Sequence, residues 1–203
     1  MKKAIFKAKT SIESQKKLYI FLIGLAILGI ISGIIFIFLI SDENIVQIKD
    51  NLTLFFKDIN TGNKLDLLFS SLINNLVYVL SIWTLGISII GLPIIITIFS
   101  FKFFFFGFSL SSIICTYKWG GILRSLVHLF PHQLLFLIVL LLVTFYAVSF
   151  CLKLFNYLFF KKMINFREVM RKYLKILLIC SLTTIFISLY EVYISTYLLN
   201  LFN

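Results

Sequence analysis

Two histidines four positions apart, His128 and His132, are the first candidates for metal chemistry in this chain. On an uninterrupted helix this spacing places both imidazoles on one face, where they can bind the same zinc ion. Pro131 interrupts that helix, and the sequence around it offers neither the glutamate of an HExxH motif nor a third ligand. We therefore expect no metal, and predict that both histidines lie at a membrane interface, satisfied by water, head groups or backbone.

Glu191 is the one acidic residue within a predicted membrane span, on the helix face that it shares with Ser188 and Ser195. A carboxylate inside a bilayer is costly unless it is paired, so a proton or ion role is a hypothesis for this residue. Its position, about 10 Å from the outer end of the helix, favours hydration instead.

Two serines stand in apolar surroundings, but neither belongs to a hydrolase motif. The segments around Ser88 and Ser109 each lack the second glycine of a GxSG motif, and no aspartate lies in a predicted span. A glycine-rich phosphate loop is also missing from the sequence. We predict that the chain is not an enzyme and needs no cofactor.

The elements that hold these residues are predicted from hydropathy. Of 203 residues, 61% are hydrophobic and 13% charged, which leaves no polar shell for a soluble core. The uncharged stretch Leu18–Ile40 would form a helix of about 35 Å, enough to cross a bilayer. We predict a single integral membrane domain over residues 1–203, an all-α polytopic bundle of about five spans. The expected spans are 18–40, 76–98, 100–117, 133–160 and 176–198.

Two segments between the spans and two residues near span boundaries have a predicted role. Residues 41–72 are expected to form an external amphipathic segment, and residues 122–130 a short interfacial or re-entrant helix before the fourth span. Pro93 should kink or break a helix, so the third span starts before Lys102, at Pro93, or else thins the bilayer. Lys102 itself is expected at or near the cytoplasmic surface.

The net charge of +11 is unevenly placed. Basic residues precede the first span and separate the last two, whereas residues 41–72 are acidic by comparison. This positive-inside pattern predicts a multi-pass protein of the cell membrane with a cytoplasmic N-terminus and an external C-terminus. Membrane lipids are the expected partner of the basic residues, and nucleic acid is not.

Small residues recur along three spans and indicate close helix packing. Packing can occur within one chain or between copies in a homo-oligomer, and the sequence leaves both open. The packing candidates are Gly29, Gly33, Gly107, Ser111 and Cys115. External apolar and aromatic residues are candidates for docking a partner: Ile45, Ile48, Leu52, Phe55, Ile59, Trp119, His128 and His132.

A series of landmarks between residues 70 and 150 resembles the stage II sporulation protein M family of endospore-forming bacteria. The landmarks include Asn74, Asn75, Gly86, Gly91, Pro93, Lys102, Gly107, Pro131 and His132. Wider relatives often have a glycine after the Pro-His pair and an acid shortly afterwards, where this chain has Gln133 and Phe136. The resemblance covers these motifs, together with the length and span pattern of the whole chain.

The resemblance implies a scaffold for forespore engulfment. Such a protein holds two wall-remodelling partners at the membrane, the amidase stage II sporulation protein P and the lytic transglycosylase stage II sporulation protein D. Two other interpretations remain open. The broken apolar segments at Pro93 and Pro131 are also typical of a transport or channel component. A member of the same family could instead serve a membrane role outside sporulation.

Overall fold

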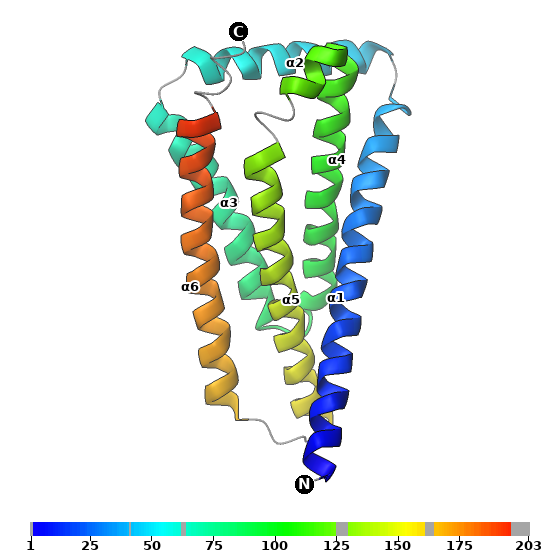
Figure 1. Ribbon diagram of the computed structural model, residues 1–203, viewed down its shortest axis with the longest axis vertical. Coiled ribbons are helices and arrows are strands. Elements are labelled where there is room, and N and C mark those ends of the chain that lie inside the picture. Colours follow the sequence, from blue (N-terminus) through cyan, green and yellow to red (C-terminus); the bar gives the residue numbers. More distant parts are fainter. Residues whose placement is uncertain (1, 41, 62–63, 125–129, 161–164, 196–203) are drawn as a thin grey trace.

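The computed structural model describes residues 2–40, 42–61, 64–124, 130–160 and 165–195, which are almost entirely helical and contain no strand. Within these residues, five helices are long and apolar enough to cross a membrane. They run side by side along the long axis of the molecule, as Figure 1 shows. The fold is therefore an all-α polytopic bundle, which confirms the class predicted from hydropathy.

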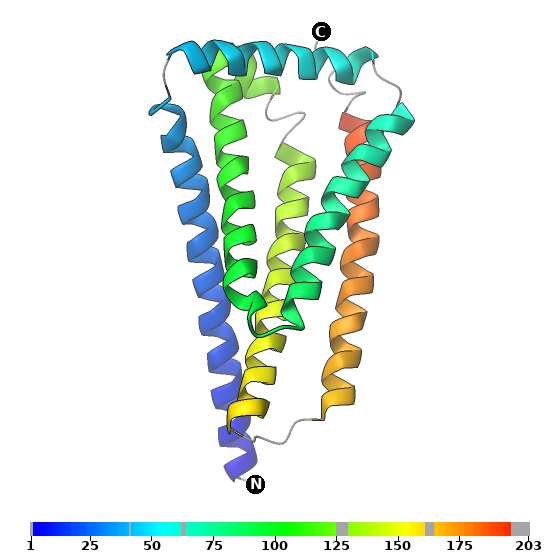
Figure 2. The same ribbon diagram turned by 180° about the vertical axis from the view of Figure 1, so that it is seen from behind.

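The first helix is a membrane span, and the second lies across one end of the bundle. Helix α1 (Lys2–Ile37) is a long span whose apolar part is Gln15–Ile37. Helix α2 (Asp42–Thr61) lies across one end of the bundle, nearly perpendicular to the spans (Figures 1 and 2). Among its described side chains, Ile45, Ile48 and Leu52 are half-buried and the others are exposed, which is the helical spacing of an amphipathic surface helix.

Helices α3 (Lys64–Gly86) and α4 (Gly91–Arg124) are joined by a tight turn. The turn is closed by backbone hydrogen bonds, including Ser88 N–H to the Leu85 carbonyl at 3.0 Å. Pro93 lies in the first turn of α4, where its missing N–H costs least. The expected second span, 76–98, is therefore misplaced. It crosses the turn and combines the last part of α3 with the first part of α4. The observed spans are 64–86 and 91–116.

The last two spans also begin earlier than expected. Helix α5 (Phe130–Phe160) and helix α6 (Phe166–Tyr190) start before the predicted positions 133 and 176. A π-helix, η2 (Glu191–Ser195), continues α6. Of the expected interfacial helix at 122–130, the first three residues belong to α4 and the last to α5. Residues 125–129 lie outside the described part of the chain.

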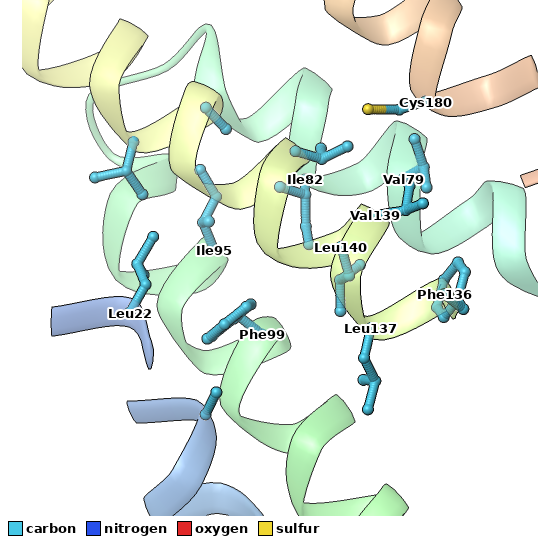
Figure 3. Packing of buried hydrophobic residues seen from close by; sticks show 14 of the residues in the cluster. Leu22, Val79, Ile82, Ile95, Phe99, Phe136, Leu137, Val139, Leu140 and Cys180 are labelled. Atoms are coloured by element: carbon cyan, nitrogen blue, oxygen red, sulfur yellow. The ribbon is translucent and has the colours of Figure 1, made fainter. Parts of the chain in front are cut away.

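Helix α5 is the centre of the bundle and contacts α1, α3, α4 and α6. In its most apolar stretch 56% of the residues are buried, more than in any other span of the described chain. Figure 3 shows Leu137 and Leu140 of α5 within a cluster that includes Ile82 of α3 and Phe99 of α4. This cluster fixes the mutual positions of the four helices that surround the site described below.

The outer surface of the bundle is apolar. Leu28, Leu178 and Phe186 are each more than 60% exposed, and they belong to helices on different sides. Exposed apolar surface on this scale is stable against lipid and not against water. Together with the five long apolar helices, it supports a multi-pass membrane protein.

Helices α1 and α4 approach closely because glycines line their contact. A Cβ atom at Gly33 would overlap the carbonyl oxygen of Phe104, and one at Gly107 would overlap that of Ile30. At Gly29 it would lie 3.0 Å from the Cβ of Phe103. These glycines are therefore used for packing within one chain.

Candidate functional site

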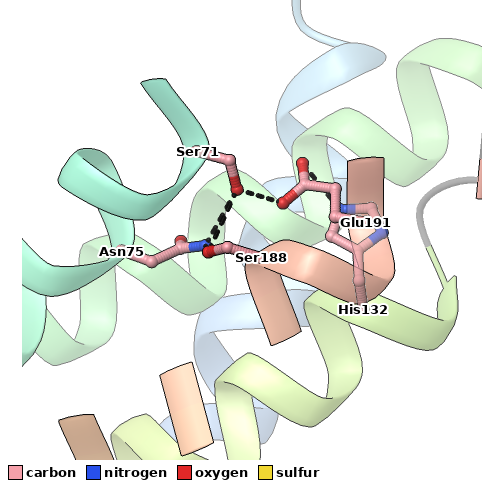
Figure 4. A network of polar contacts seen from close by, with 5 residues as sticks. All are labelled: Ser71, Asn75, His132, Ser188 and Glu191. Atoms are coloured by element: carbon pink, nitrogen blue, oxygen red, sulfur yellow. Dashed lines mark hydrogen bonds and ion pairs between the residues drawn. The ribbon is translucent and has the colours of Figure 1, made fainter. Parts of the chain in front are cut away.

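Five polar side chains from three spans meet at the end of the bundle that α2 covers. Ser71 and Asn75 come from α3, His132 from α5, Ser188 from α6 and Glu191 from the start of η2 (Figure 4). The Glu191 carboxylate accepts a hydrogen bond from Ser71 Oγ and lies 3.3 Å from His132 Nε2. Asn75 Nδ2 lies 3.4 Å from the hydroxyl oxygens of both Ser71 and Ser188. The network therefore ties three spans together through polar contacts.

Local helix geometry places the two ionisable members of this network. His132 is the third residue of α5, one residue after Pro131, and only 4% of it is exposed. Glu191 stands where the helix changes from α to π, and its own N–H still bonds to the Ile187 and Ser188 carbonyls. π-Helical turns within helices frequently occur at functional sites. This turn directs the carboxylate between α3 and α5.

A cavity of about 210 Å³ adjoins the network. It lies between α3, α4, α5 and η2, and polar residues contribute much of its wall. The lining residues are Ser71, Asn74, Asn75, Lys102, Phe105, Phe106, Ser109, His132, Gln133, Phe136, Leu137 and Glu191. A cavity with a cation, a carboxylate, an imidazole and three amides can bind a polar group or hold water inside the bundle.

Lys102 is the basic residue of this cavity. Its ammonium nitrogen lies 4.3 Å from the centre of the Tyr78 ring and 5.2 Å from that of Phe136. Both distances are within the range of cation–π attraction, which replaces part of the lost hydration. Phe136 is also the position at which the resemblance places an acid in wider relatives.

The expected position of Lys102 at the cytoplasmic surface is wrong. The third span runs over Gly91–Thr116, so Lys102 stands near its middle. The expectation assumed that a lysine must mark the end of a span. The two aromatic rings and the nearby Glu191 charge permit it to lie deeper.

The structure describes only one of the two histidines selected from the sequence. His132 is buried and paired with the side chain of Glu191, so it does not belong to an exposed docking surface. This corrects the docking prediction, because the imidazole faces Glu191 inside the bundle. His128 lies outside the described residues. Among the residues that are described, no group of three potential ligands could hold a metal ion.

The other packing candidates are split between buried and exposed positions. Ser111 is buried and donates to the Gly107 carbonyl at 3.0 Å, whereas Cys115 is exposed. On α6, Thr184 and Ser188 are buried, and Ser188 joins the polar network.

The remaining docking candidates lie mostly on α2. Ile45, Ile48 and Leu52 are half-buried, so this face of the helix is partly covered. The side chains of Phe55, Ile59 and Trp119 fall outside the described part of the structure. Val46 and Leu54, which the sequence analysis did not select, are 58% and 57% exposed.

The landmarks that carried the resemblance converge on this region. Asn74, Asn75, Lys102 and His132 all line the cavity, although they come from three different helices. Gly86 and Gly91 bound the α3–α4 turn: a Cβ at Gly86 would lie 2.9 Å from Ala147 Cβ, and one at Gly91 would overlap the Leu85 carbonyl. Ser71 was missed, because a serine in an apolar helix carries no distinguishing signal in sequence. Lys102 was recognisable, because it is a charged residue within an apolar run.

Comparison with known proteins gives one family. The family model described as Stage II sporulation protein M matches residues 18–196, which covers most of the chain and all five spans almost completely. No curated protein matches the chain, and no solved structure does.

Proposed function

Because the chain belongs to the stage II sporulation protein M family, which supports a role in sporulation, we propose that it is a membrane scaffold for forespore engulfment. In this proposal it recruits wall-remodelling enzymes to the septal and engulfing membrane and positions them there. The partners are an amidase and a lytic transglycosylase, stage II sporulation proteins P and D. The chain supplies the anchor and the partners supply the chemistry.

The observation that carries the proposal is the position of α2. This helix of 20 residues lies across one end of the bundle and is separate from the spans (Figures 1 and 2). Val46 and Leu54 are exposed on it, and Gln47, Asp50 and Asn51 are exposed beside them. A helix that exposes apolar side chains at the membrane surface is suited to docking a partner protein, and we assign the docking contact to Val46 and Leu54.

The form of the chain supports this division of labour. Glycan hydrolysis uses two carboxylates held on either side of a sugar in a cleft. The spans and α2 account for nearly all described residues, so little of the described chain is left for a substrate-binding domain. We therefore assign wall hydrolysis to the partners and no catalytic step to this protein.

The proposed orientation places α2 outside the cell membrane. The N-terminus and the ends of α5 and α6 that face each other lie at the opposite end of the bundle from α2 (Figure 1). Together these two segments carry most of the lysines and arginines of the chain, so the main basic segments share one end. The positive-inside rule assigns that end to the cytoplasm, and the described chain ends at Ser195 near α2, on the external side.

A transport role is the second candidate, and the polar cavity favours it. Transporters hold polar groups near the middle of the membrane, where broken helices expose them. Lys102 lines the cavity near the middle of its span and provides such a polar group. Solute uptake into liposomes containing the purified protein would support this alternative over the scaffold.

Capture of the two enzymes tests the scaffold. The full-length protein, solubilised in detergent from sporulating cells, should retain both partners. Replacing Val46 and Leu54 with Asp should release them, because the change removes the exposed apolar side chains of α2. A matched control, Gln47→Asp with Asn51→Asp, adds the same charge beside them and should retain both enzymes. Loss of neither enzyme from the Val46 and Leu54 variant would exclude α2 as the docking surface.

A further inference from the structure

We propose that the cavity between α3, α4, α5 and η2 binds an oxyanion, a carboxylate or phosphate group carried by a small molecule or a lipid head group. The inference is independent of the scaffold role. It follows from the position of Lys102, from the hydrogen-bond donors around it, and from the contacts that Glu191 already makes with other residues.

Lys102 supplies the positive charge. It lines the cavity from near the middle of the third span, Gly91–Thr116, whose sequence has no other charged residue. In the part of the chain that the structure describes, its ammonium group is held by the Tyr78 and Phe136 rings and not by an oxygen atom. Aromatic rings compensate a buried ammonium only partly, so an oxyanion in the cavity would gain a strong electrostatic contact.

Neutral donors surround the same space. Asn74 and Asn75 of α3, Ser109 of α4 and Gln133 of α5 line the cavity with amide and hydroxyl groups. Each can donate hydrogen bonds to a carboxylate or phosphate oxygen. A cation accompanied by neutral donors is the usual composition of an oxyanion site in a protein.

Glu191 is the only carboxylate among the residues that line the cavity, and it already has partners. One of its oxygens accepts from Ser71 and the other lies against His132 Nε2. These contacts direct the carboxylate toward α3 and α5 and disperse its charge. The competing explanation is that Lys102 serves only to balance Glu191, with which it interacts electrostatically.

The cavity is large enough for such a group and lies toward the end of the bundle that α2 covers. Its volume of about 210 Å³ equals that of about seven water molecules at roughly 30 Å³ each. This accommodates a phosphate or a carboxylate together with a few attached atoms. Ser71, His132 and Glu191 stand near the start of α3, the start of α5 and the end of α6, and these helix ends lie toward α2 (Figure 1), so a ligand would enter from that side.

The test uses the full-length protein in nanodiscs of phosphatidylcholine. Inorganic phosphate is titrated in one arm, and phosphatidylglycerol is included in the nanodisc in the other. Calorimetry reports binding of phosphate, and thermal unfolding reports stabilisation by either probe. Lys102→Met should weaken binding about tenfold or more, because it removes the charge. Lys175→Met, a control at an exposed position of α6 outside the cavity, should leave binding unchanged.

The two arms separate the sources of the anion. Phosphate binding that depends on Lys102 indicates a soluble ligand, and stabilisation by phosphatidylglycerol alone indicates a lipid head group. If Lys102→Met gives no folded protein, Gln133→Leu removes a donor from the same wall and should also weaken binding. The proposal is overturned if neither probe acts on the wild type, or if the cavity variants bind as tightly as it does. Lys102 would then serve only to balance Glu191.

Discussion

The Glu191 carboxylate lies 3.3 Å from Nε2 of His132, and this contact joins the end of α6 to the first turn of α5. The same carboxylate bonds to Ser71 of α3, 120 residues away in sequence. His132 is almost fully buried, and the side chain of Glu191 is 24% exposed. A polar contact shared by three spans in an apolar surrounding should stabilise their arrangement.

A double-mutant cycle measures that contact. Glu191→Gln and His132→Leu should each destabilise the protein, with a coupling of about 0.5–2 kcal/mol in detergent unfolding. Glu168 and Lys172 provide the control, because they form an ion pair at 2.8 Å on the same helix but are largely exposed. That pair should show a weaker coupling, because both side chains are exposed to solvent. Equal coupling for both pairs would mean that burial of the Glu191 contact has no energetic consequence.

Two glycines of α1 should respond oppositely to the same substitution. Gly33→Ala should destabilise the protein by about 1–3 kcal/mol, because the new methyl group overlaps the Phe104 carbonyl. Gly24→Ala is the matched control, since nothing lies within 4 Å of a Cβ atom there. It should be neutral or stabilising by up to about 1 kcal/mol, because alanine favours the helix. Thermal or denaturant unfolding distinguishes the two, and a tolerated Gly33→Ala would show that α1 and α4 are farther apart.

Thiol labelling tests the orientation. In a background without the three native cysteines, a cysteine at Gln47 should react with an impermeant reagent in intact cells. One at Arg167, at the other end of the bundle, should react only after the membrane is opened. Both positions are exposed in the structure, so access should depend on the side of the membrane alone. Labelling of Arg167→Cys but not Gln47→Cys in intact cells would reverse the orientation.

The purified protein alone should release no muropeptides from peptidoglycan. Glycan hydrolysis requires a pair of carboxylates in a cleft that holds sugar, and we assign this chemistry to the partners. Chromatography of the soluble products after incubation provides the measurement. The amidase and transglycosylase, added to the same preparation, are the positive control. Release by this chain alone would contradict the assignment.

The fold was predictable because span length and hydropathy are local properties. Long apolar stretches predicted an all-α bundle of about five spans, and the structure has five in its described part. The boundaries of the spans were harder to predict from the sequence. Pro93 was expected to interrupt a helix, and it lies in the first turn of a new one. Whether a proline ends or begins a helix depends on the neighbouring turn, which here is closed by tertiary packing of Gly86.

The site was only partly predictable, because it depends on contacts between distant segments. Glu191 was identified as a functional candidate from its charge within a span. Its partners Ser71 and His132 could not be assigned to it, since pairing depends on how α3, α5 and α6 are rotated. Lys102 was recognised as a landmark but placed at the surface. The Tyr78 and Phe136 rings that hold it lie on other helices, which the sequence alone does not bring together.

Imaging of the amidase in sporulating cells tests the central claim most directly. In an endospore-forming host that depends on this chain, fluorescently labelled amidase should follow the engulfing membrane. With Val46→Asp and Leu54→Asp in α2, the scaffold should remain in the membrane while the amidase disperses and engulfment stalls. The control variant, Gln47→Asp with Asn51→Asp, should preserve both. Amidase that follows the engulfing membrane in cells lacking this chain would contradict the scaffold account.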